Sequence, residues 1–269
     1  MDILQALILG IVQGLTEFLP VSSSGHLVIV PYVLGFPNAP VIFDAMVHVA
    51  TLFAVVLFFR KDLFDMARSF VSGSSSKEDV LNRKLGIMIV IATVPAAVIG
   101  FLFEDEFAAF FSDPLSAGFF LIVTGVVLIA TERIAKDSME IERLDAKKSV
   151  FVGLAQALAI LPGISRSGST IVAGMLLGLT RESATRFSFL ISVPIIAGAG
   201  AFAMKKAFVD SAWEQVSLQV LLAGTLSAFI VGFVSIGFFL GFVKKHPLNV
   251  FAYYCFIVGV AVVSGNLFW

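Results

Sequence analysis

The chain has 269 residues, of which 58% are hydrophobic and 14% charged, with a mean hydropathy of +0.99. Soluble domains carry about 45–50% apolar and about 25% charged residues, so this composition excludes a cytosolic enzyme and a disordered tail. The single cysteine, Cys255, excludes a disulfide-stapled module, and a net charge of −1 without a basic stripe predicts no nucleic-acid partner. We therefore expect an integral membrane protein.

Six apolar stretches are long enough to cross a bilayer as helices, which takes about 20 residues. They lie at 41–59, 85–103, 115–131, 187–204, 219–243 and 248–268. Two further apolar segments are interrupted by runs rich in proline, glycine and serine, LPVSSSGH from Leu19 and LPGISRSGST from Leu161. Irregular backbone at membrane depth persists only where protein or a water-filled cavity covers it. We predict an all-α membrane protein with six transmembrane helices and two re-entrant helix–loop–helix hairpins.

An internal duplication relates the two interrupted segments. A shift of 143 positions aligns residues 10–35 with 153–178 without a gap, and eight positions are identical. Each half would contain one hairpin and three spans, an odd number, so the halves would have opposite orientations, with the functional site near the midplane. The predicted division is repeat one at 1–135, a cytoplasmic linker at 136–149 and repeat two at 150–269.

The distribution of lysine and arginine predicts the orientation in the membrane. Basic residues gather in the loops 60–84, 132–148 and 244–246, whereas the loop 104–113 carries only acidic charges. Because basic loops stay in the cytoplasm, we expect both termini on the extracytoplasmic face of the cell membrane. Lys205 and Lys206 depart from this pattern.

The first hairpin carries ionisable residues at membrane depth. Gln13 and Glu17 are four positions apart, on one face of the first half-helix. A carboxylate inside a span costs at least about 2.5–3.5 kcal/mol, so it indicates function by default. The blander alternative is that Glu17 caps a loop and His26 bonds a carbonyl group. Ser22, Ser23 and Ser24 lie between them, and serines there can also serve only as helix caps.

The second hairpin carries Arg166, the only basic residue between Ser149 and Thr180. A guanidinium at a helix start, with free backbone N–H groups, is typical of a phosphate or diphosphate site. Arg166 could instead be the counter-ion of Glu17, and the two roles can coexist. The hydroxyl groups of this predicted anion site come from Ser165, Ser167 and Thr170, together with Ser22 and Ser24 of the first hairpin.

The two loops differ in their chemistry. At the positions of Glu17 and His26 the second repeat has Ile160 and Ser169, and Arg166 takes the position of Ser23. One loop thus supplies acid–base or nucleophilic groups and the other supplies anion binding, a division that favours phosphoryl chemistry. Two alternatives remain at this point: an inverted-repeat secondary transporter or channel, and a lipid-binding protein or lipid flippase that uses the same anion site without hydrolysis.

The motifs QGLTEFLPVSSSGH and PGISRSGST resemble the two signatures of the undecaprenyl-diphosphatase (bacitracin-resistance protein) family. The resemblance covers essentially the whole chain. It implies a membrane phosphatase that hydrolyses a polyprenyl diphosphate lipid to the monophosphate and recycles the carrier for cell-wall glycan synthesis, with tolerance to bacitracin when abundant. It also implies a divalent cation, Mg²⁺ or Ca²⁺, and an active site that opens to the extracytoplasmic face of the cell membrane.

The resemblance also assigns roles to residues of this chain. Glu17 matches the essential glutamate and would direct the metal, whereas Gln13 could offer only an amide as a second ligand. Ser23, His26 and Arg166 match catalytic positions, and the attacking group stays open between Ser23, His26 and water activated by His26. The sequence does not determine the oligomeric state, and a homodimer is one of the alternatives.

Four residues outside the motifs are predicted to have structural or supporting roles. His48 lies within a span, where an interhelical hydrogen bond is favoured, and Asp44 either supports the site or reaches toward the membrane surface. Tyr254, like its neighbour Tyr253, is typical of an interfacial aromatic belt.

Overall fold

The computed structural model describes residues 1–73, 75–103, 113–135, 138–209 and 216–268. Within these ranges the secondary structure is helical, apart from one isolated bridge between Met139 and Leu179. Most of the predicted acidic loop and two residues of the predicted linker lie outside the described residues.

Five helices are long and apolar enough to cross a membrane, which makes this a multi-pass membrane protein. They are α3 (Val41–Phe58), α5 (Lys77–Leu102), α7 (Pro114–Ile134), α10 (Arg181–Val209) and α11 (Leu218–Val243). Each covers one of the predicted apolar stretches. The sixth stretch forms α12 (Asn249–Phe268), a helix of 20 residues.

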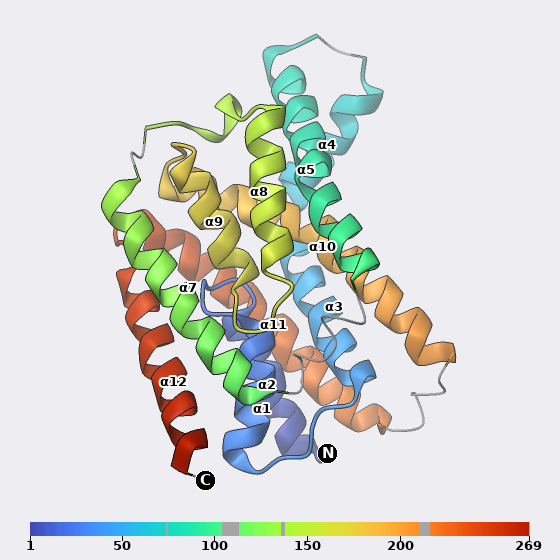
Figure 1. Ribbon diagram of the computed structural model, residues 1–269. Coiled ribbons are helices and arrows are strands. Elements are labelled where there is room, and N and C mark those ends of the chain that lie inside the picture. Colours follow the sequence, from blue (N-terminus) through green and yellow to red (C-terminus); the bar gives the residue numbers. More distant parts are fainter. Residues whose placement is uncertain (74, 104–112, 136–137, 210–215, 269) are drawn as a thin grey trace.

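The two interrupted segments form helical hairpins, as predicted. The first consists of α1 (Ile3–Thr16) and α2 (Ser23–Leu34), and the second of α8 (Ala146–Leu158) and α9 (Arg166–Leu176). Figure 1 shows the first hairpin rising from the end of the bundle where both termini lie, and the second descending from the opposite end. Their loops meet near mid-height, inside the bundle.

Matching residues of the duplication start the second helix of each hairpin. The Ser22 hydroxyl accepts a hydrogen bond from the Gly25 N–H (3.3 Å), and the Ser165 hydroxyl accepts one from the Gly168 N–H (3.0 Å). Serine satisfies the free N–H groups of a new helix in this way. The capping hydrogen bond therefore repeats as the sequence does, although the backbone differs, with a φ of 65° at Ser22 and −68° at Ser165. The division of the whole chain at 135 and 149 stays a prediction.

Glycines allow the two loops to touch. The Gly163 N–H donates to the Ser22 hydroxyl (3.0 Å), and the Gly163 carbonyl accepts from the Thr124 hydroxyl of α7 (2.9 Å). Gly163 has a φ of +98°, and a Cβ atom on it would lie 2.4 Å from the Ala117 carbonyl oxygen. Only glycine fits both the left-handed backbone and this close approach.

The first helix of each hairpin also packs on a helix of the other half. Gly10 of α1 lies against Gly224 of α11, and Gly153 of α8 lies against Ala92 and Pro95 of α5. Small residues let membrane helices approach closely, since lipid gives no hydrophobic drive for helix association. Each hairpin is therefore held in place by the opposite half of the chain.

The segment 60–84, predicted as a loop, is largely helical, and this prediction was wrong. Helix α4 (Arg60–Val71) follows α3 directly, and α5 begins at Lys77, where the Ser76 hydroxyl accepts from the Asp79 N–H. Charged residues outnumber apolar ones in this stretch and hide its amphipathic spacing. The helix is stabilised by packing, for example of Phe70 against Gly86 of α5.

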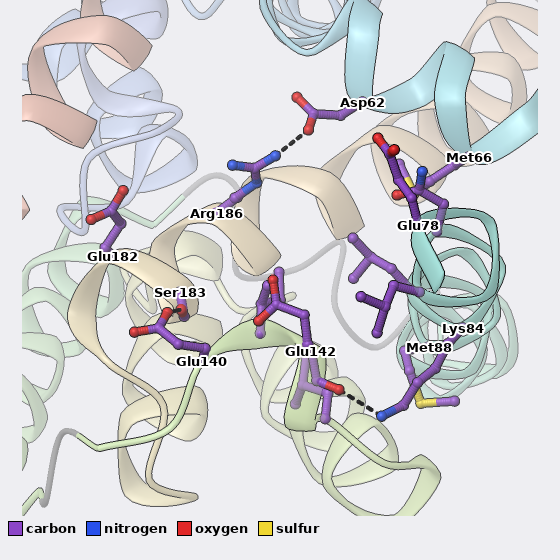
Figure 2. Close-up of a pocket in the computed structure, with 15 residues that line it drawn as sticks. Asp62, Met66, Glu78, Lys84, Met88, Glu140, Glu142, Glu182, Ser183 and Arg186 are labelled. Carbon is purple, nitrogen blue, oxygen red and sulfur yellow. Dashed lines mark hydrogen bonds and ion pairs between the residues drawn. The ribbon is translucent and has the colours of Figure 1, made fainter. Parts of the chain in front are cut away.

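A cavity of about 310 Å³ opens at this end of the bundle, between α4, α5, the short helix η2 (Ile141–Arg143) and α10. Figure 2 shows acidic side chains around it, with Asp62 paired to Arg186 and the Ser183 hydroxyl donating to Glu140 (2.6 Å). None of the site residues predicted from the sequence lines this cavity.

We expect Gly163→Ala to destabilise the protein by at least about 2 kcal/mol, since it combines a strained backbone with a clash against Ala117 and Phe120 of α7. The control is Gly241→Ala on α11, where no atom lies within 4 Å of the added methyl group. Thermal unfolding in detergent should show a lower midpoint for the first variant and an equal or higher one for the second. Equal midpoints for Gly163→Ala and the wild type would contradict this packing.

Candidate active site

The carboxylate of Glu17 lies where the two hairpin loops meet. It follows the last residue of α1, and its side chain is 6% exposed. Its Oε2 atom accepts hydrogen bonds from the Gln13 side-chain amide (3.0 Å) and the Ser23 hydroxyl (2.6 Å). The prediction that Gln13 and Glu17 share a face is confirmed, and Ser23 is brought to the same oxygen by the turn between α1 and α2.

Arg166 joins the second hairpin to the first. Its Nη2 atom lies 2.7 Å from Oε1 of Glu17, and Nη1 donates to the Ser188 carbonyl of α10 (3.3 Å). The counter-ion role considered for Arg166 is therefore what the structure shows. A buried carboxylate needs such compensation, and Glu17 receives it from one cation and two neutral donors.

The predicted anion-binding hydroxyls all lie at the junction of the two loops, where they contact protein groups. Ser167 donates to the Leu19 carbonyl of the first hairpin (2.8 Å), and Thr170 lies 2.6 Å from the Ser188 hydroxyl. The hydroxyls of Ser165 and Ser167 are 3.1 Å apart, and those of Ser22 and Ser24 are 3.4 Å apart. In this conformation these hydroxyls connect the hairpins to each other and to α10.

His26 is close in sequence to this cluster but bonds to other groups. Its Nδ1 atom lies 2.8 Å from the Ser22 carbonyl oxygen, and its Nε2 atom lies 2.8 Å from the Tyr254 hydroxyl of α12. The alternative in which His26 bonds a carbonyl is thus observed for one nitrogen. Both nitrogens are occupied, so His26 could attack phosphorus or activate water only after one contact opens.

Sequence reasoning missed His48 as a member of this site. Its Nε2 atom lies 3.8 Å from Oε2 of Glu17, and its Nδ1 atom lies 2.7 Å from the Asp44 carbonyl one turn earlier on α3. The bond of Nδ1 is therefore within one helix, not between two as favoured. The available signal was the spacing of two ionisable residues, Asp44 and His48, on one face inside a span.

The donor set for a cation is small. No group of three or more histidine, cysteine, aspartate or glutamate side chains that could hold a metal ion occurs among the described residues. However, the Oε1 atom of Gln13 is fully buried beside Glu17 and has no hydrogen-bond partner in the described structure. Hard cations favour such oxygens, and Mg²⁺ is often held by one or two carboxylates together with substrate phosphates. The residues therefore fit a cation shared with a bound diphosphate.

Comparison with known proteins places this site in a family. Residues 6–261 match the family described as bacitracin resistance protein BacA. The chain is 42% identical to the undecaprenyl-diphosphatase of Rubrobacter xylanophilus, with 98% of each chain covered. It is 40% identical to the undecaprenyl-diphosphatase of Methanosphaera stadtmanae over 98% of each chain, and 41% identical to that of Alkaliphilus metalliredigens over 99% of this chain and 100% of the relative. The chain therefore belongs to the bacitracin resistance protein family.

Proposed function

We infer that this membrane protein is a phosphatase that hydrolyses undecaprenyl diphosphate to undecaprenyl phosphate and inorganic phosphate. The family match and the relatives named undecaprenyl-diphosphatase support this reaction over the transporter and flippase alternatives. The observation that carries the proposal within the structure is the buried contact between Glu17 and Arg166, because it unites an anion-binding group with an acid–base group.

Arg166 and the start of α9 would bind the diphosphate. Arg166 is the first residue of α9, so its guanidinium stands beside the positive end of a helix. An arriving diphosphate offers several oxygens to the guanidinium and can replace the single contact with Oε1 of Glu17. The hydroxyls of Ser165, Ser167 and Thr170 lie around the same helix start. Binding thus releases Glu17 for chemistry.

Ser23 is the nucleophile that the geometry favours, because its hydroxyl already donates to Oε2 of Glu17 at 2.6 Å. The Ser23 oxygen attacks the terminal phosphorus while its proton passes to Glu17. The bond between that phosphorus and the bridging oxygen breaks, and undecaprenyl phosphate leaves. Water then attacks the phosphoserine, returning the serine hydroxyl and releasing inorganic phosphate. Attack by His26 would first require separation from Tyr254 or Ser22.

Glu17 and Oε1 of Gln13 would hold Mg²⁺ or Ca²⁺ together with the diphosphate oxygens. The unpaired, buried amide oxygen supports this assignment. The cation would neutralise charge that develops on the phosphate oxygens. The residues of the chain perform the remaining steps: Arg166 orients the headgroup and Glu17 accepts the serine proton.

We also propose the full membrane topology given by the sequence: six spans, with α12 as the sixth, two re-entrant hairpins and an inverted repeat. The entry of the hairpins from opposite ends of the bundle, with both termini at one end, supports it. The basic residues of α4 and its neighbours lie at the other end (Figure 1), so the positive-inside rule supports termini outside. A site that opens to the extracytoplasmic face is a further part of the proposal, which the family resemblance implies. A homodimer stays a prediction.

We expect Glu17→Gln and Arg166→Ala to lower the release of inorganic phosphate from undecaprenyl diphosphate at least about a hundredfold. The matched control is Arg133→Ala, which removes an exposed arginine at the end of α7. Because Arg166→Ala leaves Glu17 buried and unpaired, Arg166→Lys is measured too, and the unfolding midpoint of each variant is compared with the wild type. Folded variants of full activity would contradict the site, whereas a wild type that moves lipid or ions without releasing phosphate would favour the transport alternatives.

Ser23 should be labelled when the reaction of undecaprenyl diphosphate carrying a radioactive terminal phosphate is quenched in acid. We expect acid-stable label on Ser23 and none in Ser23→Ala, whose phosphate release should fall at least about a hundredfold. The control is Ser192→Ala on α10, whose hydroxyl donates to the Phe189 carbonyl of its own helix (2.6 Å). Label on His26, or full activity of Ser23→Ala, would rule out attack by serine.

Removal of divalent cations with EDTA should abolish phosphate release, and Mg²⁺ or Ca²⁺ should restore it. Gln13→Glu adds a second carboxylate, so the metal concentration for half-maximal activity should fall about tenfold relative to the wild type. Titration of each protein with Mg²⁺ measures this. Full activity in EDTA would show that the reaction needs no cation. An unchanged half-maximal metal concentration in Gln13→Glu would show that Gln13 is not a ligand of the cation.

A further inference from the structure

We propose that Tyr254 of α12 is a positioning residue of the phosphatase site: it fixes His26 and, through His26, the turn that carries Ser23. The expected effect on kinetics rests on the proposed function, whereas the contact between Tyr254 and His26 does not. It gives Tyr254 a role beyond the predicted interfacial belt, because its hydroxyl meets a buried imidazole 2.8 Å away.

The donors and acceptors in this contact follow from elementary chemistry. A carbonyl oxygen only accepts hydrogen bonds, so the Nδ1 atom of His26, 2.8 Å from the Ser22 carbonyl, carries the proton. The Nε2 atom of a neutral imidazole is then an acceptor, and the Tyr254 hydroxyl is the donor to it. The two rings are also nearly parallel, with an angle of 11° and centroids 5.6 Å apart. Tyr254 therefore selects one tautomer and one ring orientation of His26.

The fixed ring orientation of His26 in turn holds the backbone of Ser22 in place. The Ser22 carbonyl accepts from both the side chain and the backbone N–H of His26, the latter at 3.2 Å. Ser22 has a φ of +65° and is the one non-glycine residue with positive φ in the described parts of the chain. Such a conformation costs of order 1–3 kcal/mol and persists only where surrounding contacts hold it. The next residue is Ser23, whose hydroxyl must stay on Glu17.

Helix α12 contacts both sides of the turn. The Cys255 thiol lies 3.8 Å from the Pro20 carbonyl oxygen, before Ser22 in the chain, and the adjacent Tyr254 holds His26 after it. His26 is 4% exposed, whereas Tyr254 is 42% exposed at the surface of the bundle. Tyr254 thus links a helix outside both hairpins to the innermost turn of the site.

The decisive variant is Tyr254→Phe, which removes the hydroxyl and keeps the stacked ring. The matched control is Tyr253→Phe, one position earlier on α12, with a side chain that is 57% exposed. Loss of the hydrogen bond to Nε2 should lower kcat for undecaprenyl diphosphate about tenfold with KM within about twofold, since Arg166 still binds the headgroup. Tyr253→Phe should leave both constants unchanged. An unchanged kcat in Tyr254→Phe would overturn the proposal.

A second measurement does not depend on activity. The chain has three histidines, so ¹⁵N-histidine spectra can be assigned with His26→Gln and His246→Gln. In the wild type we expect His26 to carry its proton on Nδ1, and in Tyr254→Phe we expect the Nε2 resonance to shift while that of Tyr253→Phe stays in place. A proton on Nε2 of the wild type would overturn the proposal. A wild type that releases no phosphate yet shows the expected spectra would refute the proposed function and keep the contact between Tyr254 and His26.

Discussion

The ion pair between Glu17 and Arg166 makes the fold and the site one structure. Each charge sits on the loop of a different hairpin, at a depth where an unpaired charge costs at least about 2.5–3.5 kcal/mol. Neither hairpin can hold its charge at low cost without the other. The serine and glycine contacts between the loops are therefore reinforced by an ion pair. The interior of the bundle is stable only when both hairpins are packed in place.

The two hairpins share a helix–loop–helix scaffold, and a few differences in residue type divide the chemistry between them. The capping serines Ser22 and Ser165 make the same hydrogen bond in both copies, so the start of each second helix is fixed in the same way. The next position is Ser23 in one copy and Arg166 in the other. Both side chains reach Glu17, one as a hydroxyl donor and one as a cation. Two equivalent backbone positions thus converge on a single carboxylate.

The sequence predicted what depends on local composition. Apolar length located the spans, and proline, glycine and serine located the breaks of both hairpins. It also offered the pairing of Arg166 with Glu17 as one role for the arginine. Helix α4 was missed because its many charges favoured a loop between spans, although Leu63, Met66 and Phe70 recur at helical spacing in the sequence. His48 and Tyr254 were missed because their partners, Glu17 and His26, lie on other helices and no local pattern connects them.

The hydrogen bonds that already exist where the two loops meet also affect which lipids can bind there. Arg166, the loop serines and His26 all have protein partners in the structure, so a ligand has to exchange existing contacts at membrane depth. Exchange is favourable only when the ligand restores every charge and hydrogen bond that it displaces, since a group left unsatisfied there costs about 1–3 kcal/mol or more. A neutral lipid headgroup cannot balance the guanidinium of Arg166. A diphosphate can, and for the reaction proposed above the resting ion pair therefore excludes uncharged lipids that diffuse past the same site.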